Sequence, residues 1–400
     1  MKSQRWMSLQ FFGFFFTFGI FVPYWSTWLT ASKGFSPDKA GLIIALGLIA
    51  RSVTTFYIFP FVSRYVNLAR LNQVVSLTSV TLLIILIPFN SLIVVASITV
   101  LLSLVYPMPL AMYEAMASIL IRESKIQYGI SRSYGSIGYI ISLSLTGILI
   151  TWKSENIVIY LLIIGCVLLA FITSMNAPLP LKTKIASKKV PFFKLFKSKA
   201  FLLVLAICIT LQAAHAAYYS YAVLFLKNIG VKSSFTGFIL IIAVISEIAF
   251  FYICDSLFKR RSVPILLTFS VSASIIRWLL IFSFNSISVF VLSQLLHSLT
   301  FGLTQFAFVK YLDENIENKF FPFAHGIYAA LGLSLGSGLL TLLSGYLYTI
   351  SPPFAFLGMA IVCVPCLVMS YLLKLTLDYR DQKNLTGEIS EHVTSKRKSI

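Results

Sequence analysis

Charged side chains are scarce in this sequence. Only 11% of its 400 residues are Asp, Glu, Lys or Arg, whereas soluble domains have about 25%. Hydrophobic residues make up 58% of the chain, and the mean hydropathy is +0.89. This composition excludes a water-soluble multidomain enzyme.

Cysteine is also rare, and the five cysteines all lie in apolar runs. A small secreted protein held together by disulfides needs a denser and more regular set of cysteines, so that class is excluded too. Cys363 and Cys366 form a CxxC motif inside the apolar run VCVPCLVMSYLL. We interpret them as packing residues and not as a redox pair.

A signal-peptide cleavage site is missing after the apolar stretch that follows Lys2 and Arg5. A removed leader has a shorter apolar core that ends at small residues of the A-x-A kind. We therefore predict that this stretch is the first membrane-spanning helix.

What the sequence has in abundance is long apolar runs. One helical crossing of a bilayer takes about 20 apolar residues, whereas the strands of an outer-membrane barrel alternate apolar and polar residues. The runs exclude a barrel and predict an all-α membrane protein. Polar and turn-forming clusters divide the chain into twelve expected transmembrane helices: 6–30, 39–61, 73–89, 92–120, 132–151, 156–176, 200–226, 234–257, 264–284, 287–310, 322–348 and 353–375.

The basic residues are distributed unevenly between the two sides of these helices. Of the 32 Lys and Arg residues, 25 lie in the terminal segments and in the connections that follow the even-numbered helices. The positive-inside rule then places both termini in the cytoplasm, and the net charge of +19 is first of all a topology signal. The opposite side has only Lys33, Lys39, Lys153, Lys227 and Lys232.

The longest connection joins the sixth and seventh helices and contains seven lysines. It divides the chain into two expected six-helix bundles, residues 1–176 and 200–376, with a cytoplasmic basic linker at 177–199 and a disordered cytoplasmic tail at 377–400. Duplicated halves joined by such a linker are typical of transporters with a binding site between the two repeats.

Several ionisable residues lie within the expected membrane segments. Such residues are costly in hydrocarbon and usually mark a substrate or ion pathway. The structural alternative is a buried ion pair that fixes helix packing or, for a histidine, a hydrogen bond to a neighbouring helix. The candidates are Arg51, Glu114, Arg132, His215, Glu247, Arg277 and His297.

Aromatic residues add two weaker signals. Trp25 lies near the outer end of the first helix, where aromatic residues commonly form an interfacial belt; it is also suited to the wall of a pocket for a ring-bearing substrate. Tyr219 has the same two interpretations and shares a helix face with His215. No metal-ligand cluster and no nucleophile–base spacing is present, so neither an enzyme nor a cofactor is expected.

Several stretches resemble the major facilitator superfamily: FFTFGIFVPYWSTWL, GLIARSVTTF, QYGISRSYGSIGYIISLSLTG, LQAAHAAYYSYA, SEIAFFYICDSLFKRR, SIIRWLL and QLLHSLTFG. Within the superfamily they are most similar to proton-linked permeases of the 3-phenylpropionate transporter type, which are related to the lactose permease group. The resemblance implies import across a bacterial-type inner membrane by rocking of two six-helix bundles.

The resemblance also implies roles for particular residues. Glu247, Arg277 and His297 are similar to the proton-coupling set, and Glu114 with Arg132 is similar to the substrate-binding set. The loop FPFVSRYVNLARL departs from the superfamily because it lacks the usual glycine and aspartate. No glutamate follows His297, and the fifth segment has no Gly-Pro pair of the antiporter type.

Two further expectations come from charge alone. Arg51 is a ready bidentate ligand for a substrate carboxylate, or else the partner of Glu114 or another buried acid. Glu247 is expected to carry the proton, with Arg277 holding it ionised until substrate competes for the guanidinium.

We therefore predict a proton symporter for a small organic solute, with an aromatic carboxylate such as 3-phenylpropionate as the favoured substrate. His215, Tyr219 and Trp25 are expected to complete the substrate site together with Arg51, Glu114 and Arg132. A sugar or nucleoside symporter, a multidrug exporter and a non-transporting sensor are the alternatives. The expected partners are the substrate, the proton and the lipid bilayer, with no nucleic acid, and the expected working unit is a monomer.

Overall fold

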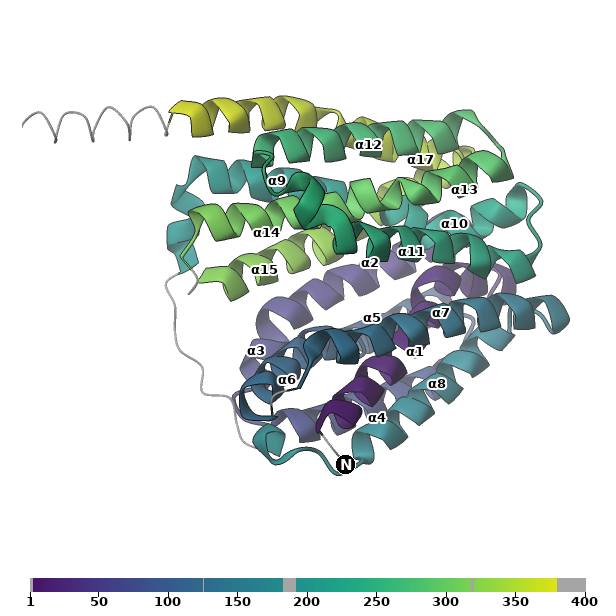
Figure 1. Cartoon of the computed structure of the whole chain (residues 1–400). Helices are drawn as coiled ribbons and strands as arrows, with labels where there is room; N and C mark the ends of the chain where they lie inside the picture. Colours follow the sequence, from purple (N-terminus) through teal and green to yellow (C-terminus); the bar gives the residue numbers. More distant parts are fainter. Residues whose placement is uncertain (1–2, 125, 183–191, 318–319, 380–400) are drawn as a thin grey trace, which may run out of the picture.

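The computed structural model describes residues 3–124, 126–182, 192–317 and 320–379. Within these ranges the regular structure is helical, with no strand. Twelve helices are long and apolar enough to cross a membrane, which confirms the expected fold class (Figure 1). Part of the expected linker, 183–191, and most of the expected tail, 380–400, lie outside the described residues.

The first six spans form one bundle, which we call the N-bundle. Several of these spans are broken into consecutive pieces. The pieces are α1 (Ser3–Thr27) with η1 (Trp28–Ser32), α2 (Pro37–Val53) with η2 (Thr54–Ile58) and α3 (Phe59–Val62), α4 (Leu68–Leu86), α5 (Leu92–Val105) with α6 (Met108–Ser124), α7 (Tyr128–Trp152) and α8 (Ile157–Ser174).

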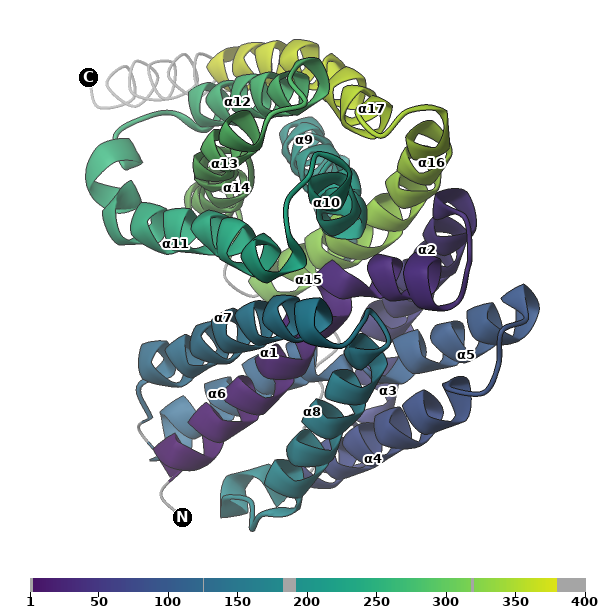
Figure 2. The ribbon, with the colours of Figure 1, turned by 90° about the vertical axis from the view of Figure 1, so that its right-hand side faces the viewer.

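The last six spans form the C-bundle, which lies beside the N-bundle in Figure 2. The last of them continues from α17 to Tyr379. The pieces are α9 (Lys199–Ala213) with α10 (Ala216–Asn228), α11 (Ser233–Phe258), α12 (Val263–Ser283), α13 (Ile287–Leu295) with η5 (Ser298–Gly302) and α14 (Leu303–Asn315), α15 (Phe321–Ala330) with η7 (Leu331–Gly336) and α16 (Ser337–Ile350), and α17 (Phe354–Cys363).

Local capping sets a boundary that differs by five residues from the one expected from the sequence. The third span starts at Leu68 and not at residue 73, because the Asn67 side chain accepts a hydrogen bond from the backbone N–H of Arg70 at 2.9 Å. An Asn at this position satisfies one of the free N–H groups of the first turn. The helix therefore includes polar residues that an apolar run does not reveal.

The two bundles meet mainly along three helix pairs, α1 with α10, α2 with α16, and α7 with α11, and α2 also contacts η7. Because the described residues form twelve spans, the start of the first span and the end of the last span lie at one end of the bundles, which we call the termini end. The backbones of the two bundles approach each other closely toward the opposite end. There a Cβ added to Gly237 of α11 would lie 2.5 Å from the carbonyl oxygen of Leu143 in α7.

Polar contacts also join the bundles at the opposite end. The Tyr221 hydroxyl donates to the carbonyl of Pro37 at 3.0 Å, and the Lys227 ammonium lies 2.5 Å from the Glu155 carboxylate. Partial burial of Glu155 disfavours its charge, but the bonds from Lys227 and from its own backbone outweigh burial and lower its pKa. The pair is therefore formed at neutral pH and is lost only as the pH falls through this lowered pKa.

We predict that Gly237→Ala forces α7 and α11 apart at the opposite end. The added methyl would meet backbone atoms about 1 Å inside ordinary contact distance, and no rotamer change relieves that overlap. Spin labels on Lys153→Cys and Lys232→Cys, both exposed, measure the separation; the five native cysteines are buried. The control is Gly326→Ala, where a Cβ meets nothing within 4 Å. An unchanged distance in Gly237→Ala would contradict the backbone contact.

Candidate functional site

A cavity of about 430 Å³ lies between the two bundles and is lined by both. This volume falls within the range of about 300–1,000 Å³ that is usual for small-molecule sites. Of the nine residues expected to form the site, six line the cavity: Trp25, Arg51, Arg132, Tyr219, Glu247 and His297.

The N-bundle wall of the cavity is aromatic. Phe18, Phe21 and Trp25 of α1 recur at helical spacing and so share one face of the helix. The Phe21 ring lies 4.9 Å from Trp25 and 5.2 Å from Tyr106, measured between centroids. The second interpretation of Trp25, as part of an apolar wall, is therefore the one that fits its position. Sequence reasoning missed Phe18, Phe21 and Tyr106 because aromatic residues are frequent throughout the chain.

Two guanidinium groups and one carboxylate line the cavity: Arg51, Arg132 and Glu247. Among the described residues neither arginine has a carboxylate within 4.0 Å. The Arg132 guanidinium lies 4.2 Å from the centroid of the Phe15 ring, a cation–π contact that holds the charge in place. It interacts electrostatically with Glu247, which reaches the cavity from the other bundle.

Arg51 is bonded across the bundle interface. Its Nε donates to the Ser334 hydroxyl at 2.9 Å, and its Nη2 donates to the Leu333 carbonyl. Both partners belong to η7 in the C-bundle. The structural alternative for Arg51 was an ion pair with Glu114 or another buried acid. Its partners are instead a carbonyl and a hydroxyl, whose positions cannot be predicted from the sequence.

A chain of polar contacts leads from Glu247, at the cavity, into the interior of the C-bundle. The Nε2 atom of His297 lies 3.7 Å from Glu247 Oε2, and the Nη1 atom of Arg277 lies 2.9 Å from His297 Nδ1. His297 thus separates the two residues, and the direct contact expected between Glu247 and Arg277 is not formed. A guanidinium only donates, so Nδ1 must accept and the His297 proton is on Nε2, facing Glu247.

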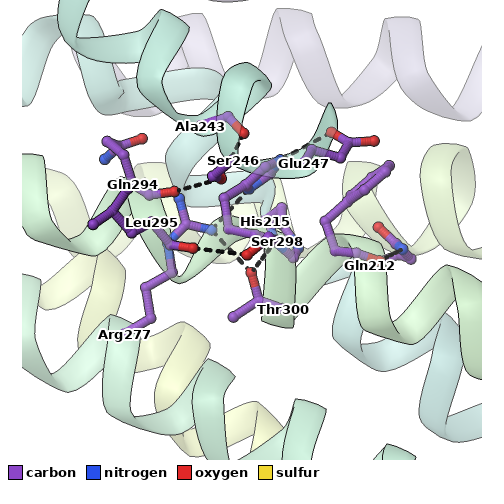
Figure 3. Close-up of polar contacts among 12 residues, drawn as sticks. Gln212, His215, Ala243, Ser246, Glu247, Arg277, Gln294, Leu295, Ser298 and Thr300 are labelled. Carbon is purple, nitrogen blue, oxygen red and sulfur yellow. Dashed lines mark hydrogen bonds and ion pairs between the residues drawn. The ribbon is translucent and has the colours of Figure 1, made fainter. Parts of the chain in front are cut away.

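Arg277 is fully buried and lies outside the cavity lining. Its guanidinium carbon lies 4.8 Å from the Tyr218 ring and 4.6 Å from the Trp278 ring. Its Nη1 also donates to the Thr300 hydroxyl at 3.0 Å (Figure 3). Aromatic faces, the Thr300 hydroxyl and a ring nitrogen of His297 therefore stabilise this charge where an acid was expected.

His215 is also fully buried and does not line the cavity. The α-helix of span seven is interrupted at this residue, where the His215 backbone N–H donates a hydrogen bond to the carbonyl of Gln212. The ring nitrogen Nδ1 then lies 2.9 Å from the Leu211 carbonyl, and Nε2 lies 3.0 Å from the Thr300 hydroxyl. These contacts match the structural alternative, a hydrogen bond to a neighbouring helix. Thr300, which also contacts Arg277, was missed because nothing in the sequence distinguishes it from other threonines in the spans.

Glu114 lies outside the cavity lining and is exposed. The Tyr128 hydroxyl lies 2.9 and 3.0 Å from its two carboxylate oxygens and donates to the group. The described residues include no ion pair between Glu114 and Arg132 within 4.0 Å; the two interact only at longer range. Within the described chain no cluster of three His, Cys, Asp or Glu residues could hold a metal ion.

Comparisons with known proteins agree with this architecture. The model of the MFS_1 like family matches residues 4–358. The chain is 26% identical over 385 residues to the probable 3-phenylpropionic acid transporter of Escherichia coli (strain K12), covering 92% of this chain and 97% of that protein. It is 28% identical over 236 residues to the uncharacterized transporter YwbF of Bacillus subtilis (strain 168), covering 58% and 59%.

Solved structures of transporters have the same fold. The nucleoside transporter NupG matches with a TM-score of 0.80 at 15% identity, covering 94% of this chain and 99% of that one. The peptide transporter POT in complex with alafosfalin matches with a TM-score of 0.74 at 11% identity, covering 93% of each. The expected resemblance to the major facilitator superfamily is confirmed: the chain belongs to the MFS_1 like family and is a transporter of the major facilitator type.

Proposed function

We propose that this transporter imports a small aromatic carboxylate together with a proton. The observation that carries the proposal is the cavity itself, in which an aromatic wall lies beside two arginines that no carboxylate neutralises at close range. The similarity to a probable 3-phenylpropionic acid transporter supports the same substrate class. The cavity is built by a single chain, so we propose a monomer as the working unit.

The substrate class follows from the two kinds of surface in the cavity. An aromatic ring gains free energy by packing against Phe18, Phe21 and Trp25, because aromatic pairs add to the burial of apolar area. A carboxylate gains charge-assisted hydrogen bonds from a guanidinium, which presents a planar fork of donors. A neutral sugar leaves the arginines without a counter-charge, which makes sugars the weaker candidates.

Glu247 is the proposed proton carrier. It is the carboxylate of the cavity lining, and its side chain is 27% exposed. When ionised, the Glu247 carboxylate repels a substrate anion and competes with that anion for Arg132. When protonated, it leaves both arginines available to the anion. His297 does not take a second proton in this arrangement, because Arg277 occupies its Nδ1.

The direction of transport rests on topology. We propose that the termini end faces the cytoplasm, because most basic residues outside the membrane lie there. The contacts that close the bundles lie toward the opposite end, so this conformation is proposed to face inward. A bacterial-type inner membrane is the proposed location.

Glu247→Gln is expected to abolish uphill uptake of 3-phenylpropionate in proteoliposomes but to retain exchange of labelled for unlabelled substrate. Glutamine cannot release a proton, whereas exchange needs no net proton movement. Glu314→Gln, which removes an exposed acid from α14, is the matched control and should transport normally. Normal accumulation by Glu247→Gln would show that another acid carries the proton, with Glu114 the next candidate.

One proton carried with one monoanion moves no net charge. Accumulation should therefore rise about tenfold for each unit of imposed pH gradient, since one pH unit corresponds to about 1.4 kcal/mol. A membrane potential imposed at constant pH should leave uptake unchanged. Uptake that responds to the potential alone would contradict one-to-one coupling through Glu247.

Arg132→Lys is expected to weaken binding of 3-phenylpropionate about tenfold, because lysine keeps the charge but loses the planar fork of donors. Calorimetry on the purified protein measures the change, and the neutral analogue 3-phenylpropan-1-ol should bind both proteins equally. Arg70→Lys, at the exposed start of α4, is the control.

A screen with uridine and lactose tests the nucleoside and sugar alternatives; preferential binding of either would replace the proposed substrate class.

A further inference from the structure

Arg51 lines the cavity and also forms hydrogen bonds to the other bundle. It belongs to α2 of the N-bundle and lines the cavity, yet its two hydrogen-bond partners, Leu333 and Ser334, belong to η7 of the C-bundle. The salt bridge between Glu155 and Lys227 also joins the bundles, but it lies at the opposite end and neither residue lines the cavity. Arg51 is thus placed to contact the second bundle and a bound molecule with the same guanidinium.

The acceptor on the C-bundle is made available by a break in helical bonding. In an α-helix the Leu333 carbonyl would accept from the N–H of Ser337. Within η7 the Ser337 N–H donates to the carbonyls of Gly332 and Ser334 instead. The Leu333 carbonyl is left without this partner, and the Arg51 guanidinium bonds to it. Turns of the π-helical kind are frequent at functional sites.

We propose that Arg51 couples substrate binding to bundle movement by exchanging partners. Without substrate it holds α2 to η7 and favours the conformation described here. A substrate carboxylate draws the guanidinium into the cavity, because a charged acceptor bonds it more strongly than a neutral carbonyl does. Release of the contact with η7 then allows the bundles to part at the opposite end.

This exchange rests on the proposed anionic substrate, and it obeys a strict energetic condition. A ligand shifts a conformational equilibrium only as far as it binds one state better than the other. Here the difference in affinity arises from the hydrogen bonds between Arg51 and η7. In the proposal these bonds exist only while α2 and η7 are in contact, and the substrate must compete with them for the guanidinium. Arg132 has no cross-bundle hydrogen bond among the described residues, so its bond to the anion does not require one to be broken.

The test measures separation of the bundles with spin labels on Lys153→Cys and Lys232→Cys in purified protein, with and without 3-phenylpropionate. Without ligand, Arg51→Gln should raise the ratio of separated to closed molecules about tenfold, the effect of one hydrogen bond to a charged group. Ligand should shift the unaltered protein in the same direction. It should still bind Arg51→Gln but cause little further shift.

Tyr221→Phe is the matched control, because it removes a cross-bundle hydrogen bond to Pro37 whose donor does not line the cavity. It should also separate the bundles, yet keep the full response to ligand. Ser334→Ala, a milder change, should give a smaller separation than Arg51→Gln and remains available if that variant folds poorly.

Two results would overturn the proposal: an unchanged distance in ligand-free Arg51→Gln and Ser334→Ala, or an Arg51→Gln protein that responds to ligand as the unaltered protein does. Calorimetry reports binding separately. If 3-phenylpropionate does not bind the unaltered protein, the proposed substrate and the exchange both fail. The ligand-free comparison still decides whether Arg51 holds the bundles together.

Discussion

The cost of placing an ion in hydrocarbon is the constraint on which the interior of this transporter depends. Every charge there must find a partner, and the arginines find theirs without acids. Arg277 lies between aromatic rings, Arg132 lies over Phe15, and Arg51 bonds to a carbonyl. These partners are neutral, so they leave the positive charge uncompensated, and the Nε and Nη2 atoms of Arg277 have no hydrogen-bond partner among the described residues. On the cavity wall, where Arg51 and Arg132 lie, we propose that this charge attracts anions.

Irregular helices supply several of those neutral partners. Where span seven breaks, the Leu211 carbonyl accepts from the His215 ring, and where span eleven widens, the Leu333 carbonyl accepts from Arg51. In span ten, η5 follows directly after His297 and contains Thr300. Broken or widened turns inside a membrane are tolerated where protein groups restore the bonding. In this transporter the side chains that restore the bonding are Arg51, which lines the cavity, and His215, which lies next to the cavity-lining residue Ala216 in the chain.

The sequence predicts the spans and the identity of the three charged residues that line the cavity, because long apolar runs and rare charges are strong local signals. Their partners depend on how helices are rotated against one another, which no local pattern records. Glu247 and Arg277 lie at similar depth, yet His297 separates them. Glu114 lies four residues from Leu110 on the same helix but only Leu110 reaches the cavity. The widened turn at η7 is equally hidden, apart from Gly332 and Gly336 close to its ends.

The contact between Gly237 and the Leu143 backbone has a consequence for the speed of transport. A seal made by interlocking side chains must fix their rotamers each time it closes, at a cost of up to about 2 kcal/mol for each long side chain. A seal made of glycine against backbone fixes none. The Gly237 contact can therefore open and close with almost no loss of conformational entropy, and that loss falls on side chains at the same end, such as Tyr221 and Lys227.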